Sequence, residues 1–444
     1  MNLENYVMNN VLNQNNYFLI FFPLTFIFGI LIAEVFFLLF LLNYFYNSNF
    51  KYLFKDTKII IVFFFAFYIL ISSIIFIHDD LIYSSLIYFR FVFFSLSVCF
   101  FFERINKINL SKNYLYIFLA LIICLILDSY FQFFNGTNIF GQTIINHRIS
   151  SFFGDELILG SYLVRVLPLI IWYIIFFNFD LNLHKNKFLI FLIIYFYCIF
   201  LSAERTSLAL LTLFVFLSII FMKSIRVIVI KSFIVFILLM ILTSIFQIGK
   251  SDVGNRVFLK TYNQLFSFTE KKIHLSKIIK KNIENKENID VKYFSTEHEG
   301  HFELALDLFK NNKIFGVGPR GFRYFCRSVN YNPEIGVCST HPHNYFIQIL
   351  SELGIIGILF YFIFLIFISL KLLSKKINNH SLVVKNQFYI ISIGLILNLF
   401  PFIPSGNFFN NWLSLMIYFN LGLYLYTYKK IFDNDNNFTT SNNN

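Results

Sequence analysis

Long apolar runs recur along most of the chain, and each is about as long as a helix that crosses a membrane. A helix rises about 1.5 Å per residue, so roughly 20 apolar residues are needed to span the hydrocarbon core of a bilayer. Of the 444 residues, 57% are apolar and only 14% are charged, and the apolar residues come in blocks rather than at amphipathic spacing. The sequence therefore predicts an all-α, polytopic membrane protein.

The positions of the predicted spans follow from these runs. The opening run, residues 17–46, is too long for one helix, and Gly29 and Glu34 interrupt its middle. It is therefore expected to form two short helices joined by a tight outward turn. The remaining spans are predicted at residues 57–77, 81–102, 113–134, 157–178, 187–203, 206–222, 227–247, 345–370, 387–402 and 408–428. The result is about twelve transmembrane helices, with one large periplasmic loop between the ninth and the tenth.

Lysine and arginine are distributed unevenly between the predicted loops, and this bias sets the orientation. With the N-terminus in the cytoplasm, the short outward loops hold only two cations, Arg148 and Arg205. The inward loops hold Lys51, Lys55, Lys58, Arg104, Lys107, Lys112, Lys185, Lys187, Lys223, Arg226, Lys371, Lys375, Lys376, Lys385, Lys429 and Lys430. Topology thus accounts for the net charge of +12, and no nucleic-acid partner is predicted. Because Arg148 and Arg205 stand against the bias, they indicate an anionic partner.

The chain divides into four predicted parts. These are an N-terminal bundle of about nine helices at residues 1–247, a periplasmic loop at 248–344, C-terminal transmembrane helices at 345–430 and a disordered cytoplasmic tail at 431–444. The N-terminal segment before the first span lacks the basic residues of a cleavable signal. The first helix is therefore expected to be retained.

The periplasmic loop has its own predicted features. A lysine-rich stretch at 271–292 is most simply a solvated surface insertion, and an amphipathic helix is predicted at 299–312. The string GVGPRG at 316–321 has the glycine spacing of a dinucleotide-binding turn. It follows a helix rather than a strand and contains a proline, so a turn that redirects the chain is predicted instead. Cys326 and Cys338 could form a disulfide in an oxidising periplasm.

Histidines in the loop raise the alternative of a metal site. They fall into two pairs about forty residues apart, His298 with His301 and His341 with His343. Zinc binds several imidazoles, but no Asp or Cys stands at a recognised ligand spacing from these histidines. No metal and no cofactor is therefore predicted.

Four ionisable residues lie inside predicted spans, where a charge is costly and usually faces the protein interior. They are Glu34, Arg90, Asp128 and Arg165. Internal ion pairs that hold the bundle together and a direct functional role both remain open for them.

A His-Pro-His-Asn cluster at residues 341–344 directly precedes the apolar run at 345–370, which places it at a membrane surface. A neutral imidazole, whose ordinary pKa is about 6.5, can take a proton from an attacking hydroxyl, and His343 is the candidate for that role. Asn344 could orient the imidazole, bind a sugar or cap the helix. The outward-facing arginines complement this base, because a guanidinium binds two phosphate oxygens at once.

These residues resemble a known signature. The run HPHNYFIQILSELGIIG is similar to that of the bacterial O-antigen ligase and O-antigen polymerase superfamily, in which a His-Asn pair opens a helix that ends in Glu-x-Gly-x-x-Gly. The matching positions here are His343, Asn344, Glu352, Gly354 and Gly357. The segments NNKIFGVGPRGFRYF and SAERTSLALL, and the arginine before SSFFGDELILGSY, also resemble parts of this family.

The resemblance implies an integral glycosyltransferase of the bacterial inner membrane whose active site faces the periplasm. It implies metal-independent transfer of a glycan from undecaprenyl diphosphate to a hydroxyl acceptor, with inversion at the anomeric carbon. His343 is then the catalytic base, and Arg148 and Arg205 bind the donor diphosphate. Supporting roles are expected for Asn344, His341, Glu352 and Arg320. Whether Arg256, Arg320 or Arg323 contacts the donor is left open.

Two alternatives remain within and beyond this family. A ligase joins a finished glycan to the lipid A core, whereas a polymerase joins repeat units to one another, and no motif in the chain separates the two. A flippase or transporter would also need many spans and buried charge. The chain lacks the repeated halves with broken helices that are typical of transporters, so this reading is less favoured.

Overall fold

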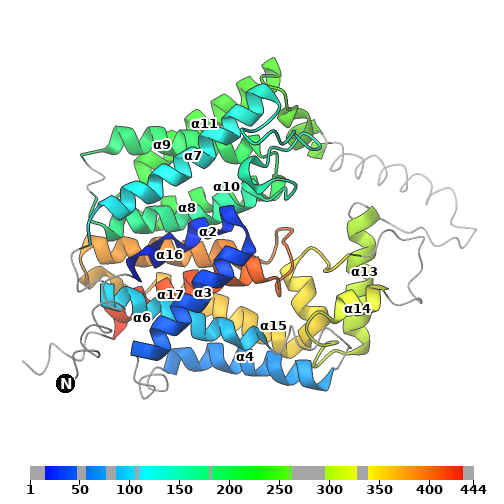
Figure 1. Cartoon of the computed structure of the whole chain (residues 1–444). Coiled ribbons are helices and arrows are strands. Elements are labelled where there is room, and N and C mark those ends of the chain that lie inside the picture. The colour runs from blue at the N-terminus through cyan, green and yellow to red at the C-terminus, as the bar shows by residue number, and fades with distance from the viewer. Residues whose placement is uncertain are drawn as a thin grey trace, which may run out of the picture.

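The computed structural model describes residues 16–47, 57–76, 87–105, 110–179, 183–259, 261–262, 296–327 and 339–433 (Figure 1). Several predicted features lie outside these residues, namely the segment before residue 16, the lysine-rich stretch 271–292, Cys338 and the tail from residue 434. The described residues are mainly helical, with two isolated β-bridges and no strand. The all-α prediction is confirmed for this part of the chain.

Helices follow one another along the described chain with mostly short connections. They are α2 (Phe22–Thr25), α3 (Ile30–Asn47), α4 (Thr57–Ile75), α6 (Arg90–Ile105), α7 (Asn113–Asn135), α8 (Leu159–Phe176), α9 (Lys185–Leu201), α10 (Arg205–Phe221), α11 (Arg226–Phe246), α13 (Thr296–Asn311), α14 (Gly321–Arg327), α15 (Tyr345–Leu372), α16 (Leu382–Asn398) and α17 (Asn411–Phe432). Shorter helical turns are η1 (Asn16–Phe21), η2 (Phe26–Phe28), η4 (Ile87–Phe89), η5 (Ser151–Phe153), η6 (Asn255–Leu259) and η8 (Lys375–Asn379).

Every predicted span contains a described helix, and the opening run is divided at Gly29, which adopts φ 108° between η2 and α3. Segments long and apolar enough to cross a membrane are Asn113–Asn135, Leu159–Phe176, Arg226–Phe246 and Tyr345–Asn379. Shorter apolar helices cover Tyr17–Phe28, Ile30–Tyr46, Val62–Ile75, Arg205–Phe221 and Leu382–Asn398. These helices support a membrane protein, whereas the count of about twelve spans and the place of the large loop stay predictions.

The helices pack in both parallel and antiparallel pairs around a buried centre. Helix α6 packs against α17, α8 against α16 and α9 against α11. In Figure 1, α7, α9 and α11 form one side of the bundle, α4 and α15 form the other, and α8, α16 and α17 lie between them. The central position of α8 explains why its side chains are buried on all sides, with Trp172 stacked on Phe176 at 4.9 Å between ring centroids.

The two ends of the bundle differ in the charged residues of their connections. Because successive long helices run in opposite directions, the α7–α8 connection, the α9–α10 turn and the starts of α15 and α17 gather at one end, called the site end below. Helices α13 and α14 lie at the same end (Figure 1). The opposite end carries Arg104, Lys112, Lys185, Lys187, Lys223, Arg226, Lys371, Lys375, Lys376, Lys385, Lys429 and Lys430.

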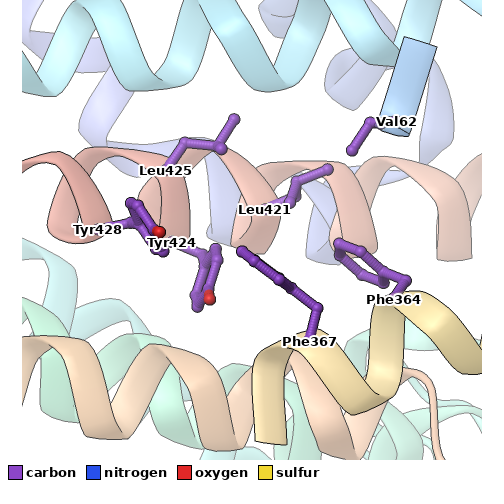
Figure 2. Close-up of a pocket in the computed structure, with 7 residues that line it drawn as sticks. All are labelled: Val62, Phe364, Phe367, Leu421, Tyr424, Leu425 and Tyr428. Atoms are coloured by element: carbon purple, nitrogen blue, oxygen red, sulfur yellow. The ribbon is translucent and has the colours of Figure 1, made fainter. Parts of the chain in front are cut away.

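One small pocket lies between α4, α15 and α17, and Figure 2 shows its apolar and aromatic lining. Its cavity measures about 20 Å³, enough for a single water-sized molecule. The lining residues are Val62, Phe364, Phe367, Leu421, Tyr424, Leu425 and Tyr428. Apart from Val62 of α4, they come from the middle and the C-terminal halves of α15 and α17, away from the site end, and the lining includes no carboxylate, imidazole or cation. This pocket is therefore not the candidate site.

An internal ion pair joins α3 to α6. Arg90 Nη2 lies 2.7 Å from Glu34 Oε1, and the guanidinium also lies over the rings of Phe37 and Phe91, 5.1 and 4.9 Å from their centroids. For Glu34 and Arg90, the structure thus shows the internal ion pair that the sequence analysis left open. Asp128 is also structural, since its carboxylate accepts hydrogen bonds from the Ile139 N–H and the Ser151 hydroxyl.

Candidate functional site

Three imidazoles meet at the site end, in front of α15. The ring of His343 lies 4.2 Å from the ring of His341 and 5.5 Å from that of His301, measured between centroids. His343 has φ 56°, and its carbonyl accepts a hydrogen bond from the Ser405 N–H at 2.9 Å. The side chain of His343 is half-buried, and its Nε2 lies 3.0 Å from Ser339 Oγ. His301, His341 and His343 are called the histidine cluster below.

His301 was not predicted to join this cluster, because it comes from α13, about forty residues earlier in the chain. Folding of α13 against α15 brings it there, a contact that sequence spacing does not encode. Among the described residues, no group of three or more His, Cys, Asp or Glu side chains is arranged to hold a metal ion. The side chain of His298 lies outside the described residues.

His341 has the environment of an uncharged, structural histidine. It is buried, its Nε2 lies 3.3 Å from the Ser405 carbonyl and its Nδ1 lies 3.0 Å from Thr340 Oγ1. Burial lowers its pKa to about 4, and the nearby His301 adds to this effect. The ring is therefore neutral at pH 7, which leaves the half-buried His343 as the better placed base.

Asn344 occupies the N-cap position of α15. Its Oδ1 accepts a hydrogen bond from the Ile347 N–H at 3.0 Å, and its Nδ2 donates to the Pro401 carbonyl at 2.9 Å. Of the roles left open by the sequence, helix capping is the one seen in the structure. The cap also joins the start of α15 to the connection between α16 and α17, so that it fixes the segment carrying His343.

A buried polar network supports the same region. The fully buried carboxylate of Glu352 accepts hydrogen bonds from the Phe322 N–H at 3.1 Å and from Gln348 Nε2 at 3.0 Å. Arg320 is electrostatically coupled to Glu352, and its Nη2 donates to the Phe409 carbonyl at 2.9 Å. Glu352 and Arg320 thus hold α14, α15 and the start of α17 together beneath the histidine cluster.

The glycine segment at 316–321 packs against a break in α15. Gly354 has φ 64° and ψ −161°, values that interrupt the helix. The Ile355 N–H donates to the Lys313 carbonyl at 2.9 Å, and the Val317 N–H donates to the Ser351 carbonyl at 3.0 Å. A Cβ on Gly354 would lie 2.3 Å from the Ile314 carbonyl oxygen, which is too close. The segment is therefore a docking turn that fits onto the break, in agreement with the predicted turn.

Replacing Gly354 with Ala is expected to lower the free energy of unfolding by roughly 2–4 kcal/mol, because the change adds a positive-φ penalty and a backbone clash. Thermal unfolding of the detergent-purified protein measures this loss. Gly141→Ala is the matched control, since Gly141 also has positive φ (+82°) but has no atom within 4 Å of the added Cβ. Equal destabilisation by both changes would show that the close backbone contact at Gly354 is unimportant.

Arginines gather in a second group at the site end. Arg148 forms an ion pair with Glu204, with Nη2 and Oε1 3.1 Å apart, and Arg205 lies exposed at the start of α10. Arg256, in η6, donates to the Asn146 carbonyl at 2.8 Å and to the Ala203 carbonyl at 3.2 Å. Arg148, Arg205 and Arg256 are called the arginine cluster below.

The charges within this cluster interact. Burial is the main cause that lowers the pKa of Arg256, and the positive charges of Arg148 and Arg205 lower it further. The structure thus brings together the two predicted arginines and adds Arg256, which the sequence had left open. By contrast, Arg323 lies in α14, where its positive charge acts on the neighbouring Arg320. Three neighbouring guanidinium groups create a region that favours an anion.

Glu204 is a structural partner of the cluster that sequence reasoning missed. Its carboxylate accepts hydrogen bonds from the N–H groups of Gly160 and Ser161 at 3.1 and 3.0 Å, in the first turn of α8, and from the Ser207 hydroxyl at 2.9 Å. Burial raises the pKa of Glu204, while Arg148 opposes that rise. The available signal was its position directly before Arg205, where a carboxylate can serve the start of a helix.

Cysteines add little to the site. Cys326 is buried in α14, and because its predicted partner Cys338 lies outside the described residues, the disulfide stays a prediction. Cys99, Cys124 and Cys198 are free thiols within helices, the first and the last of them buried and Cys124 exposed.

Comparison with known proteins finds a family match over the part of the chain that holds most of the site. Residues 190–362 match the family model described as O-Antigen ligase. This region is therefore similar to the O-antigen ligase and O-antigen polymerase superfamily, as the sequence signature indicated. The match runs from α9 into α15, so that it includes Arg205, Arg256 and the histidine cluster, whereas Arg148 precedes it. No curated protein and no solved structure matches the chain. The family indicates ligase-type or polymerase-type glycosyl transfer at a membrane.

Proposed function

We propose that the chain is an O-antigen ligase that transfers a glycan from undecaprenyl diphosphate to a hydroxyl of the lipid A core. One observation carries the proposal most strongly. A half-buried histidine and a cluster of arginines lie at the same end of the helix bundle, at the level where the helices begin and end. A lipid-linked diphosphate would present its charged group at that level while its polyprenyl tail stays in the membrane.

The chemistry needs one base and one anion site. The acceptor hydroxyl loses its proton to His343 as its oxygen attacks the anomeric carbon. The bond from that carbon to the diphosphate oxygen breaks, and the electron pair leaves with the diphosphate, whose charge the arginine cluster stabilises. Attack from the face opposite the leaving group inverts the anomeric carbon. Fixed guanidinium groups provide the charge stabilisation, so a metal ion is not required, and added chelator should leave transfer unchanged.

The distribution of cations supports a periplasmic active site in the inner membrane. Apart from Arg148 and Arg205, the lysines and arginines in the described short connections between apolar helices lie at the end opposite the site end, and the positive-inside rule assigns that opposite end to the cytoplasm. An outward-facing site is separated from the cytoplasmic nucleotide sugars. A lipid-linked donor is therefore the natural substrate on that side.

Deleting the encoding gene and separating the surface glycan on a gel distinguishes a ligase from a polymerase. Loss of a ligase should leave long glycan on the undecaprenyl carrier and none on the lipid A core. Loss of a polymerase should instead leave core capped by a single repeat unit. Complementation with the wild-type gene should restore the original banding. Failure of the purified protein to transfer glycan from a lipid-linked donor to either acceptor would contradict both enzymes and favour transport.

A further inference from the structure

Arg165 is a buried cation that the proposed clamp does not use. It lies in α8, only 5% exposed, and its Nη1 donates to the carbonyl of Ser161 at 3.1 Å and to the Ser161 hydroxyl. In the part of the chain that the structure describes, no carboxylate forms an ion pair with Arg165. A buried guanidinium without a counter-charge is costly, which points to an anion supplied from outside the chain.

The guanidinium of Arg165 lies at the level of the first turn of α8. Side chains in a helix lean toward its N-terminus, and the bonds to Ser161 hold the guanidinium one helical turn closer to the N-terminus of α8 than the Cα of Arg165. The Ser161 N–H in turn donates to Glu204, the partner of Arg148. Arg165 is therefore connected to the arginine cluster through two residues, Ser161 and Glu204.

Arg165 also contacts the start of α15. Its guanidinium lies beside the hydroxyl of Tyr345, the first residue of that helix, which stands two positions after His343 in the sequence. The side chain is thus linked to Arg148 through Ser161 and Glu204, and it lies beside the first residue of the helix that follows His343. A breaking bond between an anomeric carbon and a phosphate oxygen would be located near these two segments.

Arg165 Nε has no hydrogen-bond partner among the described residues, and the Tyr345 hydroxyl, whose side chain is 1% exposed, has the Arg165 guanidinium beside it. Buried polar groups are generally satisfied, so the unsatisfied Nε indicates a missing partner. An oxygen that carries negative charge suits both, because Nε–H and O–H can each donate to it.

We propose that Arg165, assisted by Tyr345, contacts the sugar-proximal phosphate of the lipid-linked donor and stabilises its charge as the glycosidic bond breaks. The inference rests on the proposed function and assigns a catalytic residue that the clamp does not include. As the acceptor oxygen bonds to the anomeric carbon, the acceptor proton goes to His343 and the electron pair of the breaking bond goes to the phosphate oxygen that faces Arg165. The products are the glycoside and the lipid diphosphate.

The position of Arg165 predicts an effect on turnover rather than on donor binding. Charge on the leaving oxygen is greatest in the transition state, so a group aimed at it changes kcat more than KM. We expect Arg165→Gln to lower kcat by roughly 100-fold to 1,000-fold with donor KM changed less than about threefold. Arg165→Lys should retain part of the activity, and Tyr345→Phe should lower kcat by roughly 10-fold.

Steady-state kinetics of the full chain in lipid nanodiscs, with a polyprenyl diphosphate-linked glycan as donor, tests these values. Tyr361→Phe is the matched control on α15, since Tyr361 is also buried and its hydroxyl bonds to the Leu399 carbonyl. Arg226→Gln is the control for loss of an arginine, at the opposite end of the bundle. Both controls should keep wild-type kcat.

Thermal unfolding of each variant separates chemistry from folding. A folded Arg165→Gln protein with wild-type kcat would overturn the inference, and so would a kcat loss in Arg165→Gln, Arg165→Lys and Tyr345→Phe that merely follows the folded fraction. A full loss on His343→Ala alongside normal Arg165 variants would reject this inference and leave the proposed function standing. Normal transfer by His343→Ala would instead reject the proposed function.

Discussion

Replacing His343 with Ala should abolish detectable glycan transfer. The expected loss in kcat is roughly 100-fold to 10,000-fold, the usual contribution of a general base. The change removes the half-buried imidazole at the centre of the histidine cluster while Asn344 continues to cap α15. His341 cannot replace it, because burial holds its pKa at about 4 and its Nε2 faces the Ser405 carbonyl. The measurement is transfer from a lipid-linked donor by purified protein, together with complementation of a deletion strain.

A matched control for His343→Ala exists at the opposite end of the bundle. His380 precedes α16, and its Nε2 lies 2.9 Å from the carbonyl of Ile431, so His380→Ala removes an imidazole without touching the site end. It should keep wild-type transfer. His343→Ala protein must also insert in the membrane and unfold at a temperature near that of the wild type. Full transfer by a folded His343→Ala protein would exclude His343 as the base.

Local patterns predicted the helices and the two ends of the bundle well. Apolar runs located the helices because each lipid-facing or buried helix needs a continuous apolar length, and Gly29 marked a true break because positive φ suits glycine. Arg148 and Arg205 were found because two cations stood against the charge bias. Each of these signals is contained in a short stretch of chain.

Contacts between distant segments could not be predicted in the same way. His301 reaches His343 only because α13 folds back on α15, and Glu204 reaches Arg148 only because the α9–α10 turn packs on the first turn of α8. The glycine string looked like a turn, but its partner, the break at Gly354, depends on backbone contacts with residues some forty positions away. Such pairings arise from packing, which a linear pattern does not record.

Replacing Arg205 with Ala should also abolish transfer, by weakening the donor site rather than the base. Arg205 is the exposed member of the arginine cluster and stands at the N-terminus of α10, where the helix dipole also favours an anion. Its loss should raise the donor KM and lower kcat/KM by roughly 100-fold or more, since the clamp holds the phosphates before and during the reaction. Arg205→Lys should recover part of this loss, because lysine keeps the charge but not the two-pronged geometry.

Binding measurements separate this effect from that of His343. In titrations with a polyprenyl diphosphate that carries no glycan, Arg205→Ala should bind at least 10-fold more weakly than wild type, whereas His343→Ala should bind normally because its change affects only the proton acceptor. Arg226→Ala serves as the control for charge, since Arg226 lies at the cytoplasmic end of the proposed topology. If Arg205→Ala binds and turns over the donor like wild type, the diphosphate must lie elsewhere, and the arginine cluster would then be explained by its ion pair and backbone contacts alone.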